Sequence, residues 1–212
     1  MLRIRFAAAF VLMLFSGLTI AQNDMAPLCP SSDPIQELVQ GFEDNLKGQY
    51  QLMAEPTDAD YRRYVEDLRN MSLPRSFFTA PQRVKSCQLL QQQSIFFMLW
   101  ERQSKIKENA NPHTNPAIIE SPSSFDTPQI GQQRDDWVVN PRSIFFQCLV
   151  SETKHSDLKA LLREYQSVPD ISPGLMAYAL LDINQFDEQG IRAFIALHLY
   201  YSFVMGINGL NQ

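Results

Sequence analysis

The chain has 212 residues, of which 45% are hydrophobic and 19% charged, with a formal net charge of −5 and three cysteines. A chain of this length buries on the order of 70% of its unfolded surface, so it can build a core without metal ions or many disulfides. The acidic balance argues against nucleic acid or an anionic lipid surface as the main partner.

The N-terminus has the pattern of an export signal. A basic start with Arg3 and Arg5 precedes an uncharged apolar stretch, residues 6–15, and small residues follow it. The apolar stretch is about half as long as the roughly 20 residues of a membrane-spanning helix, which favours a cleaved signal over an anchor. We therefore expect residues 1–21 to be removed and residues 22–212 to be exported, to the periplasm in a bacterium or by secretion otherwise.

The mature chain has few glycines and long stretches in which apolar residues recur every three to four positions. This pattern predicts an all-α fold, a single helical domain of about six or seven helices. The apolar face of the first helix is expected to run from Ile35 to Met53, and the first three helices to form a hairpin-like layer that runs up, down and up. The expected helices cover approximately residues 34–54, 58–71, 79–109, 143–150, 156–167, 172–183 and 188–205.

Two of these segments have a competing interpretation. Residues 143–150 have the composition of a strand, but we expect a helix because Pro141 resembles a helix start and no strand partner is evident. Residues 191–207 are apolar enough to suggest a membrane span, but they are at the short limit for one. We expect them to form the buried central helix of a protein that does not insert stably into a membrane, with Gly206 as its left-handed stop.

Residues 109–141 form a Pro-rich loop that holds five of the thirteen prolines. The residue before a proline avoids helical geometry, so this stretch is not a continuous helix. A connection longer than about 15 residues without secondary structure is uncommon inside a domain and is often functional. Apolar residues such as Ile118 and Trp137 indicate that the loop packs back onto the helices. We expect it to present a surface to a partner.

The three cysteines allow three disulfide pairings in an oxidising compartment. If the first three helices run up, down and up, Cys29 lies near the end of the layer where Cys87 begins the third helix. Cys87 and Cys148 would lie too far apart if their helices are antiparallel neighbours, because a bridge needs Cα atoms within about 7 Å. The sequence therefore favours a Cys29–Cys87 bridge and leaves Cys148 as a free thiol.

The most site-like cluster is Asp135, Asp136 and Trp137, where two acids precede an aromatic ring. The acids are suited to bind a cation, and the ring to stack on a sugar or to anchor a protein partner. The competing interpretation, a turn with the tryptophan in the core, is the one we favour. His113 in the Pro-rich loop is a further candidate for binding. No His or Cys residues stand at metal-ligand spacing, and we expect no metal and no cofactor.

The sequence contains no Gly-x-Ser-x-Gly nucleophile motif and no phosphate-cradling glycine loop, which leans against an enzyme. We therefore expect an exported helical binding protein that acts through protein–protein contacts, such as an adaptor, assembly factor or inhibitor. Fourteen phenylalanines leave open a carrier of a lipid or other apolar ligand in a helical cavity. A secreted hydrolase that uses scattered carboxylates is the remaining alternative.

Overall fold

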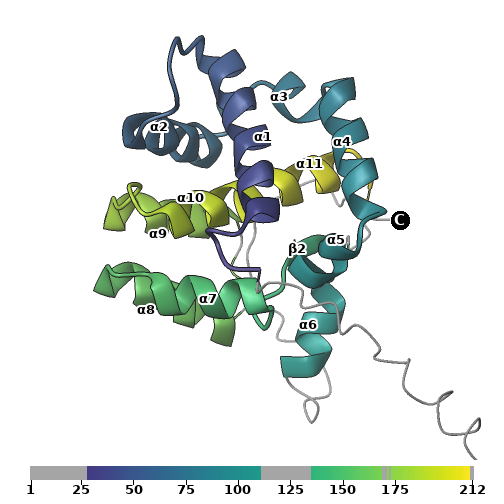
Figure 1. Ribbon diagram of the computed structural model, residues 1–212, viewed down its shortest axis with the longest axis vertical. Helices are drawn as coiled ribbons and strands as arrows, with labels where there is room; N and C mark the ends of the chain where they lie inside the picture. The colour runs from purple at the N-terminus through teal and green to yellow at the C-terminus, as the bar shows by residue number, and fades with distance from the viewer. Residues whose placement is uncertain (1–27, 111–134, 169–170, 172, 211–212) are drawn as a thin grey trace, which may run out of the picture.

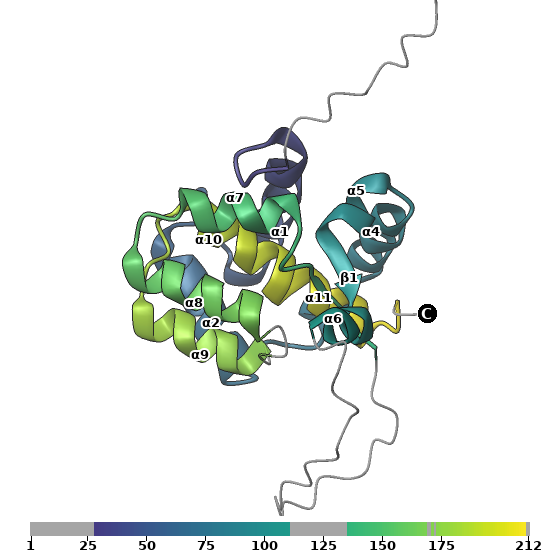
Figure 2. The same ribbon diagram turned by 90° about the horizontal axis from the view of Figure 1, so that it is seen from below.

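The computed structural model describes residues 28–110, 135–168, 171 and 173–210. These residues are mostly helical, which confirms the all-α prediction (Figure 1). Helices α10 (Gln189–Phe194) and α11 (Ser202–Ile207) join through a π-helical segment, Ile195–Tyr201, into one continuous helix. We call Gln189–Ile207 the central helix, because it runs through the middle of the molecule in both views (Figures 1 and 2).

The central helix is the core of the described structure, as its composition predicts. Residues 193–201 are all buried. It is the one helix of the described residues that is long and apolar enough to cross a membrane, and 67% of its most apolar window is buried in the protein. The expected stop at Gly206 is wrong. The helix continues to Ile207, and the left-handed glycine is Gly209, with φ of 66°.

Helix α1 (Asp33–Tyr50) packs directly on the central helix. A Cβ atom at Gly41 would lie 2.9 Å from the hydroxyl oxygen of Tyr201, so only glycine allows this close approach. The Tyr201 hydroxyl donates a hydrogen bond of 3.1 Å to the Leu38 carbonyl. The contact is completed by Asn45, whose Nδ2 donates to the Tyr200 hydroxyl at 2.8 Å.

The first helix is shorter than expected, and one of its predicted core residues lies outside it. The backbone of Gln51 turns to a left-handed φ of 55°, which ends α1 at Tyr50. Met53 follows this turn and is fully exposed, so its assignment to the apolar face is wrong. The seven-residue spacing from Leu46 to Met53 fits a helical face, but the chain leaves the helix between them.

Helix α2 (Asp58–Arg69) lies beside α9 (Pro173–Ile183) and not in a hairpin-like layer with its neighbours in sequence. The two helices are antiparallel, because Arg62 near the start of α2 donates a 2.9 Å hydrogen bond to Asn184, just after the end of α9. A capping box stands at the start of α2, with reciprocal bonds between Thr57 and Asp60.

The single helix expected over residues 79–109 is wrong, because the chain breaks there twice. After α3 (Ser76–Thr79) it forms α4 (Pro81–Gln91), α5 (Ser94–Leu99), strand β1 (Trp100–Arg102) and α6 (Gln103–Ala110). β1 pairs antiparallel with β2 (Trp137–Val139), with Trp100 opposite Val139. These breaks, together with α3, give more helices than the six or seven expected. The β-branched and aromatic residues at the end of the Pro-rich loop supply a strand partner that helical periodicity did not reveal.

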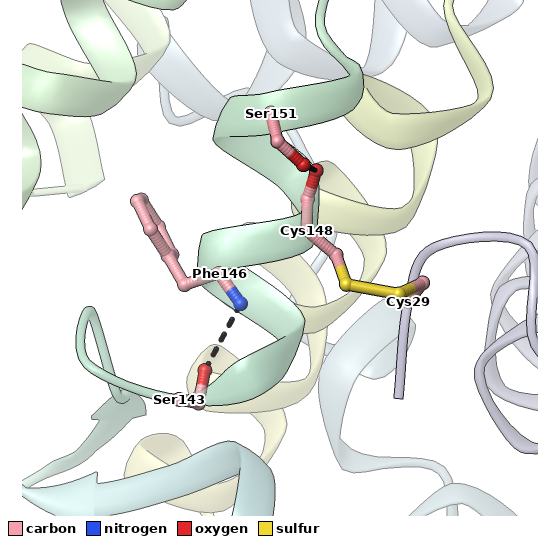
Figure 3. The surroundings of a disulfide bond; sticks show 5 residues. All are labelled: Cys29, Ser143, Phe146, Cys148 and Ser151. Carbon is pink, nitrogen blue, oxygen red and sulfur yellow. Dashed lines mark hydrogen bonds between the residues drawn. A yellow bond between two sulfur atoms is a disulfide. The ribbon is translucent and has the colours of Figure 1, made fainter. Parts of the chain in front are cut away.

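The strand-like segment 143–150 is a helix, as favoured. It forms α7 (Ile144–Glu152), and the Ser143 hydroxyl caps its start by accepting a 3.1 Å hydrogen bond from the Phe146 amide (Figure 3). Helix α8 (Ser156–Ser167) follows with the expected bounds. In Figure 1, α7 and α8 lie on the opposite side of α9 and α10 from α2.

The disulfide joins Cys29 to Cys148, with their Cα atoms 5.2 Å apart, and Cys87 is a buried free thiol (Figure 3). The expected Cys29–Cys87 bridge is therefore wrong. It assumed an up-down-up layer, whereas Cys87 lies on α4, 1% exposed, in the hydrophobic core. The segment before α1 instead runs beside α7 (Figure 3). Burial raises the pKa of the Cys87 thiol to about 12, so this cysteine is an inert core residue.

Candidate functional site

The predicted cluster at residues 135–137 is structural. The Asp135 carboxylate accepts hydrogen bonds from the backbone amide and the hydroxyl of Ser104, at 2.8 and 2.9 Å, and so caps the first turn of α6. The carbonyl oxygen of Asp136 accepts a 3.0 Å bond from the Gln103 amide. The two acids therefore hold the end of the Pro-rich loop against α6.

The ring of Trp137 packs into an aromatic cluster and does not present a free face. It contacts Phe96 edge-on at 4.8 Å between ring centroids, and the Arg102 guanidinium stacks over it at 4.2 Å. Its Nε1 is buried and has no hydrogen-bond partner within the described part of the chain. The expected turn is wrong, because Trp137 begins strand β2. The packing of the partly buried ring against the core agrees with the favoured interpretation and argues against sugar stacking. His113 lies outside the described residues.

A polar pocket of about 600 Å³ lies at the N-terminal end of the central helix. The Glu188 carboxylate there accepts hydrogen bonds from the backbone amides of Lys154 and His155, at 3.2 and 2.9 Å, ahead of α8. This carboxylate therefore holds the backbone that leads into α8, at the N-cap residue His155 and the residue before it. Gly190 lines the pocket and lets α10 approach α7, since a Cβ there would lie 2.8 Å from Leu149 Cδ1.

A smaller hollow of about 270 Å³ lies next to the polar pocket, and its Arg192 side chain also has partners within the chain. The Arg192 guanidinium in this hollow forms an ion pair with Asp58 at 2.5 Å and donates to the Phe186 carbonyl at 3.0 Å. It also lies over the ring of Tyr61, 5.0 Å from the centroid. Glu188 and Arg192 at this end of the central helix thus have internal partners, whereas the buried Nδ1 of His155 in the polar pocket has none among the described residues.

His198 in the π-helical segment is 1% exposed and stacks on Phe194 with 5.0 Å between centroids. Its Nδ1 lies 3.4 Å from the Tyr165 hydroxyl, which donates to the Val139 carbonyl at 3.2 Å. The His198 Nε2 is buried and has no hydrogen-bond partner in the described structure. Burial lowers the pKa of His198 to about 4, which keeps the ring neutral.

An apolar groove of about 500 Å³ lies at the C-terminal end of the central helix. It is formed where the end of α2, the turn after it, α3, the start of α9 and α11 meet. Its apolar lining consists of Leu68, Met71, Leu73, Phe78, Phe203 and Ile207. The volume falls within the roughly 300–1,000 Å³ of ligand sites, and an apolar lining with a few polar groups is typical of them.

Met71 combines two unfavourable features at the edge of this groove. Its side chain is 91% exposed, and its backbone has a left-handed φ of 54°. The turn is a Schellman motif, in which the Met71 amide bonds to the Leu68 carbonyl and the Ser72 amide to the Asp67 carbonyl. Glycine is the usual residue at this position because other side chains are strained there. The chain thus has a large apolar side chain at a backbone position that favours glycine, which has no side chain.

The polar groups at the groove are unequal in their internal contacts. The two oxygens of the Asp67 carboxylate each accept a 2.8 Å hydrogen bond, one from the Tyr50 hydroxyl and one from the Ser72 hydroxyl. Arg69 and Arg75 are exposed, and neither forms an ion pair within the described ranges. The Arg69 Nε donates a hydrogen bond of 3.3 Å to Asn70 Oδ1. The groove therefore combines an apolar lining with two exposed guanidinium groups that have no ion-pair partner among the described residues.

Sequence reasoning did not find this groove, because its parts come from four separate helices. The helix expected over residues 58–71, with Met71 on its apolar face, is wrong at its end: α2 stops at Arg69, and Met71 is exposed in the turn that follows. Aromatic residues that could have lined a lipid cavity are mostly packed on one another in the core, as Phe42, Tyr64 and Tyr200 are, whereas Phe78 and Phe203 line the groove.

Comparison of the chain with protein-family models, with curated proteins and with solved structures finds no match.

Proposed function

We propose that this protein is an exported binding protein that holds a protein partner in the apolar groove at the C-terminal end of the central helix. The observation that supports this proposal most is that the apolar side chain of Met71 is exposed on a left-handed residue, in a turn where glycine would be more stable. A residue that is costly for folding and faces solvent points to a contact made in a complex.

The wider surface supports a macromolecular partner. Gly174 at the start of α9 lines the groove, and the outer face of the same helix carries Leu175 and Tyr178, which are 58% and 60% exposed. Apolar surface thus extends from the groove along α9. Exposed apolar area of this kind, rimmed by polar residues, is typical of protein interaction sites. The export signal expected in residues 1–21 supports an encounter in the periplasm or the secreted space, and the Cys29–Cys148 bridge is compatible with such an oxidising compartment.

Photocrosslinking tests this proposal with a control inside the chain. A benzophenone amino acid at Met71 is expected to form adducts with a protein of the exported fraction. The same label at Met53, an equally exposed methionine in the turn after α1, is expected to form none. Equal labelling from the two positions, or no adduct from position 71, would contradict the proposal.

A carrier of a lipid or other apolar ligand is the second candidate, favoured by the volume and the apolar lining of the same groove. Organic extraction of the purified protein followed by mass spectrometry distinguishes the two candidates. A stoichiometric apolar compound that disappears in a Met71→Glu variant supports the carrier, whereas a protein free of such compounds supports the binding protein.

A further inference from the structure

We propose that the groove takes an amphipathic helix with acidic side chains, supplied by the protein partner. This inference rests on the proposed function and names the chemistry that the groove recognises. It depends on three properties of the groove: its charge, its lack of a strand edge and the spacing of its apolar residues.

The charge at the groove is opposite to that of the chain as a whole. The protein has a formal net charge of −5, yet Arg69 and Arg75 border the groove without an ion-pair partner among the described residues. Asp67 is the acidic residue in the lining, and two internal hydrogen bonds hold its carboxylate. Acidic side chains on a partner would meet the two guanidinium groups, which favours anionic over cationic partners.

The groove has no strand edge to pair with an extended peptide. Its lining residues belong to α2, α3, α9, α11 and the segment between α2 and α3; β2 packs against α11, but no residue of β1 or β2 lines the groove. The amides of Met71 and Ser72 in the turn are already bonded to carbonyls of α2. A partner backbone that enters this apolar groove must therefore satisfy its own hydrogen bonds, which a helix does and an extended strand does not.

The apolar residues present a surface suited to the ridge of a helix. Phe203 and Ile207 stand four residues apart on α11, and Met71 lines the same groove from the turn after α2. A helix with apolar residues at positions i, i+3, i+4 and i+7 buries that ridge in such a groove and keeps its charged flanks at the rim.

Two synthetic peptides of about 16 residues test the inference on the mature, oxidised chain. Both carry leucines at helical spacing on one face; one has glutamates on its flanks and the other has lysines. Isothermal titration calorimetry is expected to show binding of the glutamate peptide at least about tenfold tighter than of the lysine peptide. An Arg69→Glu/Arg75→Glu variant is expected to reverse this order.

Matched variants keep the test specific. Arg142→Glu/Arg163→Glu changes the same charge at two exposed arginines outside the groove lining, and it is expected to leave the order of the peptides unchanged. Met71→Ser is expected to weaken the glutamate peptide by about tenfold and Met53→Ser to leave it unaltered. Circular dichroism of each variant confirms that it is folded.

Three results would overturn the inference. The first is equal binding of both peptides, or of neither. The second is that the protein binds oleate, that the Met71→Ser variant loses this binding, and that the glutamate peptide does not displace oleate. The third is a concentration-dependent dimer abolished by Met71→Ser, which would make a second copy the occupant. If position 71 crosslinks to a protein but the protein binds the glutamate and lysine peptides with equal affinity, the helix inference fails and the proposed binding function stands.

Discussion

The two ends of the central helix each border a hollow of similar size, about 600 Å³ at the N-terminal end and about 500 Å³ at the C-terminal end. At the N-terminal end, Glu188 caps the start of α8, and Arg192 next to it pairs with Asp58. At the C-terminal end, Met71 is exposed and Arg69 and Arg75 have no ion-pair partner in the described part of the protein.

The difference separates a hollow whose Glu188 and Arg192 are paired within the chain from one whose two arginines have no ion-pair partner among the described residues. A buried or half-buried polar group that finds an internal partner contributes to stability, whereas exposed apolar area and free guanidinium groups contribute nothing until a second molecule covers them. Changes at the polar pocket should therefore act on folding, and changes at the apolar groove on binding.

The largest effect is expected from the disulfide beside the polar pocket. Cys29→Ser removes a bridge that closes a loop of 119 residues, and the loss of this constraint on the unfolded chain should lower the free energy of unfolding by about 4 kcal/mol. Cys87→Ala is the control and should cost about 1 kcal/mol, because it only shortens a buried side chain. Urea denaturation measures both. A larger loss from Cys87→Ala than from Cys29→Ser would contradict this pairing.

The next effect concerns pH and the middle of the central helix. His198 has its pKa lowered to about 4 in the folded protein from 6.5 in the unfolded chain, so the unfolded state binds the proton more tightly. The free energy of unfolding has its full value above pH 6.5 and should fall by about 3 kcal/mol as the pH drops to 4. Replacing His198 by phenylalanine should flatten the unfolding free energy over this window. An unchanged slope in this variant would show that other groups cause the pH dependence.

A smaller effect is expected at the polar pocket itself. Glu188→Ala leaves the amides of Lys154 and His155 without their acceptor and should cost about 1 kcal/mol of stability, as the loss of a helix cap does. Glu188→Gln retains an acceptor oxygen and should cost less. Thermal unfolding of both variants measures the difference. Equal losses of stability would mean that Glu188 does not stabilise the fold through the hydrogen bonds that its carboxylate accepts.

The smallest change in stability, with the opposite sign, is expected at the groove. Met71→Gly relieves the left-handed backbone at φ of 54° and should raise the free energy of unfolding by up to about 1 kcal/mol. The same substitution should abolish capture of the partner. Gain of stability with loss of binding would sharpen the contrast between the two ends. A destabilised Met71→Gly would assign Met71 to the fold and remove the argument for a site.

Much of the fold follows from local sequence signals. Helices α2, α8 and α9 and the buried central helix were all predictable, because caps and apolar spacing act within a few residues. The break at Trp100 was not, because it depends on pairing with Val139 across the Pro-rich loop. The Cys29–Cys148 bridge was missed for the same reason: it depends on which helices are neighbours in space.

The candidate site was less predictable than the fold. Asp135 stands out in the sequence, yet its carboxylate serves the first turn of α6, which is a contact between distant segments. The groove joins Met71 to Phe203 and Ile207, and no periodicity relates these positions. Local patterns report where a helix begins and which face it buries, but they do not report which faces remain uncovered after packing.

Hydrogen exchange of the oxidised protein, with and without the glutamate peptide at saturation, tests most directly whether the apolar end and not the polar end binds. The account predicts added protection at the end of α2, in α3 and in α11, with no change in residues 152–155 and 185–190 around the polar pocket. Protection centred on the polar pocket, with exchange at the groove unaltered, would contradict it.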